Sequence, residues 1–203
     1  MSDTIAGYTK SMDVLVGEFA KLPGIGRKTA ERLSYHVMTM SGKEAKALTD
    51  AVRGVKEETK QCSVCCSFTD QDPCRICTDE SRDSSVVCVV EQPKDAMVIE
   101  RSGCYHGLYH ILMGRISPLE GVDANDLTIS KLAARVRDKK IKEVILATNP
   151  DMEGDGTALY ISKILSGRGV KISRIARGLP TGSSIEYASG PILNDALRGR
   201  KEF

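Results

Sequence analysis

The chain contains no tryptophan, and phenylalanine and tyrosine occur only three and six times among its 203 residues. This scarcity argues against a surface on which successive nucleic-acid bases stack, because such surfaces are built from exposed aromatic rings. No apolar run approaches the roughly 18 residues that a transmembrane helix needs. The opening "MSDTIAGYTK" lacks the basic and then apolar pattern of a signal peptide. We therefore expect a cytoplasmic protein without a membrane partner.

A bias toward one sign of charge is also missing, since 29 Lys and Arg residues are balanced by 27 Asp and Glu residues. Basic residues nevertheless concentrate in "KLPGIGRKTAER" and in the stretch that follows Arg168. Local basic patches fit a nucleic-acid partner, although the overall balance does not require one. Seven cysteines are present. In a reducing cytoplasm we expect them to be metal ligands or buried thiols rather than disulfides.

Hydrophobic periodicity predicts two kinds of structure along the chain. Apolar residues at helical spacing predict three helices in the first sixty residues, over about 7–20, 30–40 and 45–60. After residue 83, four short apolar runs predict buried strands: "SVVCVV", "YHIL", "EVILAT" and "VKISRIA". Helical segments are predicted between the strands at about 93–100, 129–139 and 156–165. Strands that alternate with helices predict an α/β layer around a mainly parallel sheet.

The loop between the first two predicted helices is rich in glycine and followed by basic residues. Gly24 and Gly26 in "LPGIGRK" permit positive φ and a close approach of the backbone to a ligand. The amides of this loop and of the next helix can point at a phosphate, with Lys21, Arg27 and Lys28 adding charge. Such contacts would read the sugar-phosphate backbone and not the base sequence. The alternative is an ordinary connection between two helices.

Four cysteines follow the pattern C-x2-C-x8-C-x2-C, at Cys62, Cys65, Cys74 and Cys77. Four thiolates complete a closed tetrahedral zinc site, which predicts one structural Zn²⁺ per chain. The surrounding stretch has few apolar residues, so zinc binding would supply the free energy that folds it. Redox-active or unliganded thiols are the alternative. Cys88 lies in an apolar run and is predicted to be a small core residue.

Acidic residues follow two of the predicted strands. Glu91 comes after "SVVCVV", and "NPDMEGD" with Asn149, Asp151, Glu153 and Asp155 comes after "EVILAT". Ligand sites of parallel sheets gather at the carboxyl ends of the strands. Carboxylates from both strands could therefore share a Mg²⁺. The alternative is a solvated turn whose carboxylates favour the N-terminus of the following helix.

These motifs, in this order, resemble the RecR family of bacterial recombination mediators. The resemblance rests on "LPGIGRKTAERL", the four cysteines, "VVEQPKDAMVIE", "YHGLYHILMGRISPLEGV", "ILATNPDMEGDGTALYI" and "EYASGPILNDALRGR". Glu91 with "NPDMEGD" is similar to the Toprim signature, except that Asn149 stands where the first loop aspartate belongs. The resemblance implies a helix-hairpin-helix DNA-binding region at 1–60, a zinc finger at 61–83, a Toprim domain at 84–180 and a C-terminal oligomerisation element at 181–203.

The resemblance also implies what the chain does. Members of the family act with RecO- and RecF-type proteins at single-stranded gaps and double-strand/single-strand junctions in DNA. They help to load the RecA recombinase, and they form rings, so a homo-tetramer or dimer associated with the nucleoid is expected here. The residues expected to face DNA are Lys21, Gly24, Gly26, Arg27 and Lys28. Glu91, Asn149 and Glu153 are expected to contact the partner protein.

An enzymatic Toprim protein, such as a nuclease, primase or topoisomerase, is the alternative function. It would use Mg²⁺ held by Glu91, Asp151 and Asp155. Asn149 argues against an enzyme, because a neutral amide adds no negative charge to bind a hard cation. The site then loses affinity for the ion that would neutralise the charge on a reacting phosphate. We therefore expect weak Mg²⁺ binding at most and no catalysis. The chain also lacks a G-x-x-x-x-G-K-[ST] loop, so no ATPase activity is expected.

Overall fold

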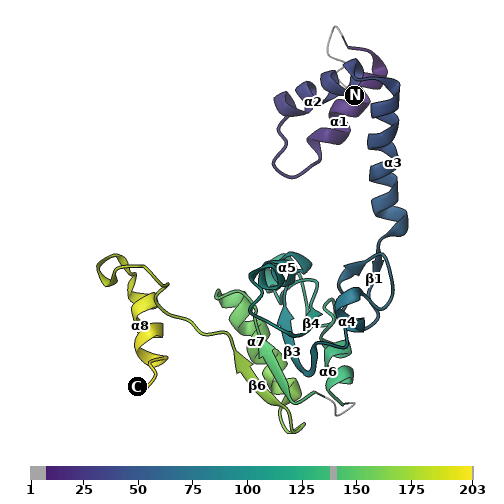
Figure 1. Ribbon diagram of the computed structural model, residues 1–203. Coiled ribbons are helices and arrows are strands. Elements are labelled where there is room, and N and C mark those ends of the chain that lie inside the picture. The colour runs from purple at the N-terminus through teal and green to yellow at the C-terminus, as the bar shows by residue number, and fades with distance from the viewer. Residues whose placement is uncertain (1–7, 138–140, 203) are drawn as a thin grey trace. The chain divides into compact units, whose positions relative to one another are not determined.

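The computed structural model describes residues 8–137 and 141–202. The chain divides into two compact units, Met1–Thr59 and Lys60–Phe203, which are treated separately below (Figure 1). Among the described residues, no helix is long and apolar enough to cross a membrane.

The first unit consists of helices α1 (Lys10–Ala20), α2 (Arg27–Thr39) and α3 (Gly42–Glu58). The first helix begins three residues later than expected, because the Thr9 side chain caps it by accepting from the Met12 amide. A capping box between Ser41 and Glu44 begins α3. The small core joins Met12 and Val16 of α1 to Ala30 of α2. The three predicted helices are therefore confirmed.

The long helix α3 carries an apolar stripe that stays open to solvent. Leu48, Val52 and Val55 are 44%, 62% and 66% exposed. None of the residues of α3 is buried within the described part of the chain. This stripe is a surface that a partner could cover.

The cysteine-rich stretch folds into a short hairpin and one turn of helix. Strands β1 (Lys60–Gln61) and β2 (Phe68–Thr69) pair antiparallel, and helix α4 (Arg75–Thr78) follows. The sequence of this stretch is polar and has no helical period. Hydrophobic periodicity does not predict these short elements, because their buried residues are mainly cysteines and they have no regular apolar face.

The core of the second unit is a parallel sheet with the strand order β4-β3-β5-β6. Its strands are β3 (Asp83–Val90), β4 (Gly107–Ile111), β5 (Glu143–Leu146) and β6 (Lys171–Arg174). All three neighbouring pairs are parallel. The four predicted strands and the parallel α/β fold are therefore confirmed.

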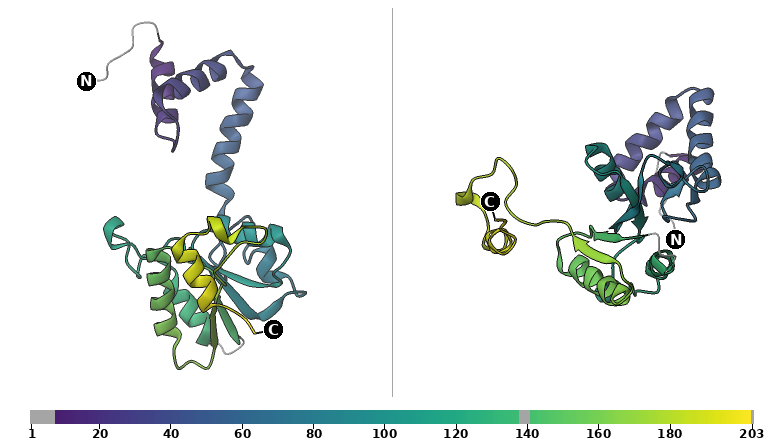
Figure 2. Two further views of the ribbon diagram at one scale, coloured as in Figure 1. Left: turned by 90° about the vertical axis from the view of Figure 1, so that its left-hand side faces the viewer. Right: turned by 60° about the horizontal axis from the view of Figure 1, so that its bottom comes forward.

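Helices cover both faces of this sheet (Figure 2). Val87 and Val89 of β3 pack in one core with α6 (Ile129–Arg137) and α7 (Met152–Leu165). Cys88 and Val90, which alternate with them, pack in a second core with α5 (Pro93–Ser102). This alternation is the period-two pattern of a strand with both faces buried. Positions 138 and 139, the expected end of α6, lie outside the described residues.

Buried thiol and imidazole groups complete these cores. Cys88 is 3% exposed, which confirms its prediction as a core residue, and burial raises the pKa of its thiol to about 12. His110 of β4 is fully buried, with Nε2 3.1 Å from the Thr128 carbonyl. Burial lowers the pKa of its imidazole to about 4, so it is neutral at pH 7.

The remaining elements lie in the loops and at the C-terminal end. The 3-10 helix η1 (Pro118–Glu120) follows β4, and η2 (Ile185–Tyr187) and α8 (Gly190–Arg198) follow β6. Helix α8 is strongly amphipathic, yet within the described chain it buries none of its residues. Leu197 is 67% exposed. This helix therefore presents a second apolar stripe to solvent.

Candidate functional site

The glycine loop of the first unit ends at the N-terminus of α2. Gly24 has φ +78°, a left-handed conformation that side chains disfavour, as the sequence predicted. Gly26 is the N-cap of α2 with φ −77°, a value open to any residue, so the expected freedom is used only at Gly24. The first amides of α2 point out of this end of the helix and can donate to an anion.

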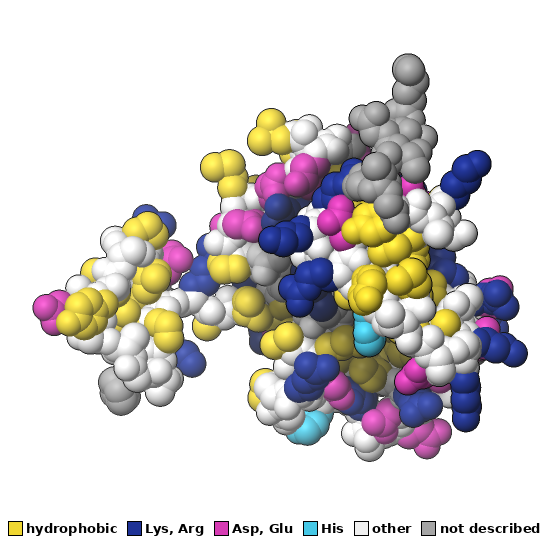
Figure 3. Space-filling model, turned by 90° about the horizontal axis from the view of Figure 1, so that it is seen from above, with side chains coloured by type: hydrophobic (Ala, Val, Ile, Leu, Met, Phe, Trp, Pro, Cys, Tyr) yellow, Lys and Arg dark blue, Asp and Glu magenta, His cyan; other side chains and the backbone are white. Residues whose placement is uncertain are grey.

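Basic side chains surround this helix end and reach into solvent. Lys21 is 71% exposed and pairs with Glu18 at 2.7 Å, and Arg27 is 64% exposed and lies 3.5 Å from Glu31. Such exposed pairs contribute little to stability, so both cations can exchange a carboxylate for a phosphate. The space-filling view shows hydrophobic side chains beside basic ones on the face that it presents (Figure 3).

The predicted residue Lys28 lies beside two residues of α2 that were not predicted, Arg32 and Tyr35. Lys28, Arg32 and Tyr35 line a shallow hollow of about 410 Å³ together with Tyr8 and Glu31. Positions 28, 32 and 35 lie on one face of the helix. Helical spacing could have found Arg32, which extends the basic face by one turn beyond Lys28.

The four predicted zinc ligands converge. One sulfur from each of Cys62, Cys65, Cys74 and Cys77 lies within 4.8 Å of the others. The Sγ atoms of Cys65 and Cys74 are 3.6 Å apart. Sulfurs at about 2.3 Å from a tetrahedral zinc are roughly 3.8 Å apart, so the cluster has the size that this ion requires. The Cys74 amide also donates to the Cys62 sulfur at 3.3 Å, which orients that ligand.

The four thiols of the cluster influence one another's ionisation. A hydrogen bond from Cys77 lowers the pKa of Cys65 to about 5, while the same bond raises the pKa of Cys77. Burial raises the pKa of Cys74 to about 11. The Cys65 thiolate is thus stabilised while the thiols of Cys74 and Cys77 favour their protonated form. Holding four thiolates side by side requires a metal ion. The cluster fits a structural zinc site.

At the carboxyl end of β3, Glu91 is held by Asn149. The backbone amide of Asn149 donates to Glu91 Oε1 and its side-chain amide donates to Oε2, both at 2.7 Å. Glu91 is only 4% exposed. In this chain its carboxylate is bound by Asn149, and its contact with a partner protein stays a prediction. The exposed Asn149 covers the carboxylate.

The acidic motif is mostly helical, which corrects the predicted start of the helix near residue 156. Helix α7 begins at Met152, and Asp151 is its N-cap, with Oδ1 accepting from the Gly154 amide at 2.7 Å. Gly154 is buried, and a Cβ there would collide with the Asn149 carbonyl. Glu153 and Asp155 consequently lie in the first turn, where negative charge is favourable.

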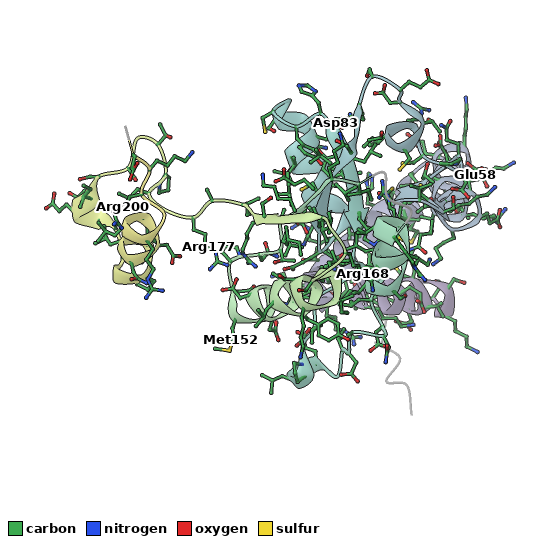
Figure 4. All side chains as sticks on the ribbon, turned by 90° about the horizontal axis from the view of Figure 1, so that it is seen from below. Glu58, Asp83, Met152, Arg168, Arg177 and Arg200 are labelled. Atoms are coloured by element: carbon green, nitrogen blue, oxygen red, sulfur yellow. The ribbon has the colours of Figure 1, made fainter. Side chains whose placement is uncertain are left out.

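Three arginines neutralise these carboxylates. Arg115 bridges Asp151 and Glu153, with distances of 3.0 Å from Nη1 to Asp151 Oδ2 and 2.6 Å from Nε to Glu153 Oε2. Arg174 lies 2.6 Å from Asp155 Oδ1, and Arg177 pairs with both oxygens of the same carboxylate. Figure 4 labels Met152 at the start of α7 and Arg177 on the segment after β6.

The structure thus does not assemble the expected Mg²⁺ ligands. Glu91, Asp151 and Asp155 each contact a separate amide or guanidinium group. Among the described residues, the cysteine cluster is the one group with metal-binding geometry. The carboxyl edge does contain a polar pocket of about 380 Å³, lined in part by Glu91, Asn149, Lys94, Arg115 and Glu120. Arg115 was not predicted as a site residue, because nothing in the sequence around it marks it as one.

Comparison with known proteins agrees with this architecture. The family model of the RecR helix-hairpin-helix matches residues 12–55, that of the RecR four-cysteine zinc finger domain matches 59–79, and that of the Toprim domain matches 85–176.

Three relatives named "Recombination protein RecR" match over nearly their whole length. The relative from Syntrophotalea carbinolica is 50% identical over 97% of this chain and 98% of its own. Those from Rhodopirellula baltica and Heliobacterium modesticaldum are each 47% identical, over 98% and 97% of this chain and 100% and 98% of their own. The chain therefore belongs to the RecR family of recombination proteins.

Proposed function

We propose that the chain is a DNA-binding mediator of recombinational repair that works with RecO- and RecF-type partners and catalyses no reaction itself. In this role it helps to load a RecA-type recombinase at single-stranded gaps and junctions, on the nucleoid DNA of the cytoplasm. The observation that carries the proposal is the full-length similarity to recombination proteins. The exposed basic end of α2 and the neutralised acidic face of the Toprim domain support it.

DNA contact is assigned to the α2 end of the hairpin. The amides after Gly24 and Gly26, with Lys21, Arg27 and Lys28, offer donors and positive charge without a group shaped to read a base. Contacts of this kind bind phosphates of any sequence. They suit a factor that must act wherever a gap occurs, on single-stranded or gapped duplex DNA.

Partner contact is assigned to the Toprim face around Asn149 and Glu153. Asn149 is exposed above Glu91, while Glu153 is partly exposed and already paired with Arg115. Leu119 and Met152, which are 97% and 89% exposed, add apolar surface at the same edge. A partner would therefore meet a mixed polar and apolar surface with little net negative charge.

Absence of catalysis is proposed from the state of the carboxylates. A Mg²⁺-dependent nuclease, primase or topoisomerase needs carboxylates that can bind the ion. Here each of them already has an amide or arginine partner. Any Mg²⁺ must compete with those groups, so we propose that it binds weakly, with Kd of roughly 1 mM or above.

Assembly into a homo-oligomer, a tetrameric ring or a dimer, is proposed from the two apolar stripes. The stripe of α3 and that of α8 are exposed on the single chain. Monomeric proteins rarely leave contiguous apolar patches of this kind uncovered. Light scattering of the chain, alone and with gapped DNA and a RecO-type partner, would measure the mass. A monomer at micromolar concentration would contradict this assembly.

The mediator role is tested by recombinase loading. Gapped circular DNA is coated with single-strand-binding protein, and the DNA-dependent ATPase of a RecA-type recombinase reports loading. We expect the chain with its RecO-type partner to shorten the lag several-fold, and the Arg27→Ala, Lys28→Ala variant to lose most of this effect. An unchanged lag with the wild-type chain would contradict the proposal.

A further inference from the structure

The arginines of the acidic face occupy the positions where a cation would act. The Arg115 guanidinium lies between two carboxylates, Asp151 and Glu153, and contacts them through different nitrogens at 3.0 Å and 2.6 Å. A divalent ion shared by two carboxylates makes the same connection. The bridge joins the segment after β4 to the N-terminus of α7, 36 residues away in the chain.

Further contacts fix the segment that carries Arg115. The Ile116 amide donates to Thr157 Oγ1 at 2.9 Å, and the Ser117 hydroxyl donates to the Glu153 carboxylate. Residues 115, 116 and 117 are thus each anchored to α7. Anchoring holds the guanidinium in place before any ligand arrives, so little side-chain entropy is lost in keeping the bridge.

The two remaining carboxylates, those of Asp155 and Glu91, also have hydrogen-bond donors within the chain. Arg174 and Arg177 both contact Asp155, and the hydrogen bond from Arg177 lowers the pKa of that carboxyl. Glu91 accepts two hydrogen bonds from Asn149. Three arginines and one asparagine therefore bind the four carboxylates of this face, which are Glu91, Asp151, Glu153 and Asp155.

We propose that Arg115 is a built-in cation that replaces a divalent metal ion at this Toprim face and keeps such ions out, with Arg174 and Arg177 doing the same at Asp155. The face is then ordered and nearly neutral whatever the Mg²⁺ concentration. A tethered guanidinium cannot diffuse away, whereas Mg²⁺ must shed water before it binds carboxylates. The inference concerns the chain alone and does not depend on the mediator role.

The test compares Mn²⁺ binding to the zinc-loaded full chain and to two variants. Electron paramagnetic resonance of free Mn²⁺ gives the bound fraction at constant ionic strength and about pH 7.5. We expect the wild-type chain to leave Mn²⁺ free up to about 1 mM. Arg115→Gln frees Asp151 and Glu153 and should bind one ion at least ten-fold more tightly. Arg101→Gln, which removes an exposed arginine of α5, is the matched control and should behave as wild type.

Two further variants locate the gained Mn²⁺ binding and provide a substitute if Arg115→Gln does not fold. Adding Asp151→Asn to Arg115→Gln should abolish the gained Mn²⁺ binding, which locates it at this pair. If Arg115→Gln does not fold, Arg115→Met replaces it, because methionine keeps an unbranched side chain without the charge, and Mn²⁺ binding should appear in the same way.

Two results would overturn the proposal: wild-type binding with Kd below about 0.1 mM, or folded Arg115 variants that gain no binding. Recombinase loading is measured separately, so either failure leaves the mediator proposal to be judged by its own assay.

Discussion

Replacing Asn149 by aspartate restores the residue that the Toprim signature has at this position and sets two carboxylates against each other. In the structure, Asn149 Nδ2 donates to Glu91 Oε2 at 2.7 Å, and Glu91 is 4% exposed. Asn149→Asp removes the donor and adds a negative charge in its place. The folded variant must either tolerate the repulsion or take up a proton.

The loss of stability in Asn149→Asp is set by whichever costs less free energy, charge repulsion or proton uptake. Two unit charges about 3 Å apart repel by roughly 5 kcal/mol at an effective dielectric constant of about 20. Protonating one ordinary carboxyl, with a pKa of about 4.3, costs about 3.7 kcal/mol at pH 7. Proton uptake therefore wins, and the protonated group donates to Glu91 again. We expect Asn149→Asp to lower the free energy of unfolding by about 3–4 kcal/mol at pH 7.

Proton uptake also makes the stability of Asn149→Asp depend on pH. Between about pH 4.5 and 7 the folded variant holds one proton more than its unfolded chain, so its stability falls as the pH rises. Relative to wild type, the deficit should grow by about 1.4 kcal/mol per pH unit, from about 1 kcal/mol at pH 5. Urea unfolding followed by circular dichroism at pH 5, 6 and 7 measures this difference for zinc-loaded protein.

Asn149→Ala is the matched control, since it removes the donor without adding charge. It leaves Glu91 with one hydrogen bond fewer, which should cost about 1–3 kcal/mol at every pH. If Asn149→Asp and Asn149→Ala give parallel curves without a pH slope, the close pairing of Glu91 with residue 149 is refuted.

Three further predictions concern zinc, DNA and acid stability. Cys74→Ser should reduce zinc, measured by mass spectrometry, from one ion per chain to almost none; full zinc content would contradict the ligand set. Arg27→Ala with Lys28→Ala should lower the slope of log Kd against log salt by about 1.4–1.8, whereas Lys163→Ala on α7 should not change it. His110 is neutral when folded, so the protein should lose about 3 kcal/mol of stability as the pH falls from about 6.5 to about 4. His110→Gln should flatten this acid loss in urea titrations, and an unchanged curve would contradict it.

The helices and strands could be predicted because their signals are local. "EVILAT" is an unbroken apolar run, and the structure places β5 (Glu143–Leu146) there, between two strands. The cysteine cluster was equally predictable, since the spacing of Cys62, Cys65, Cys74 and Cys77 already specifies a tetrahedral site.

The start of α7 was wrong because glycine usually disfavours a helix. Gly154 and Gly156 suggested a loop, but the first turn forms around Gly154, where packing against Asn149 leaves no room for a side chain. Tertiary contact thus overrides the local propensity.

The state of the acidic face could not be predicted from sequence. Arg115 is 36 residues from Asp151, and Arg177 is 22 residues from Asp155. No periodicity or motif links such positions. The sequence showed the carboxylates and the missing aspartate, but only the fold shows which cations they meet.

One incubation decides whether this chain binds DNA without cutting or joining it. End-labelled single-stranded, nicked and gapped DNA is mixed with the zinc-loaded chain in Mg²⁺ or Mn²⁺, and the products are separated on denaturing and topological gels. We expect unchanged strand lengths and topology, with binding visible on native gels of the same samples. Cleavage, synthesis or strand passage that disappears in Asp151→Ala would contradict it.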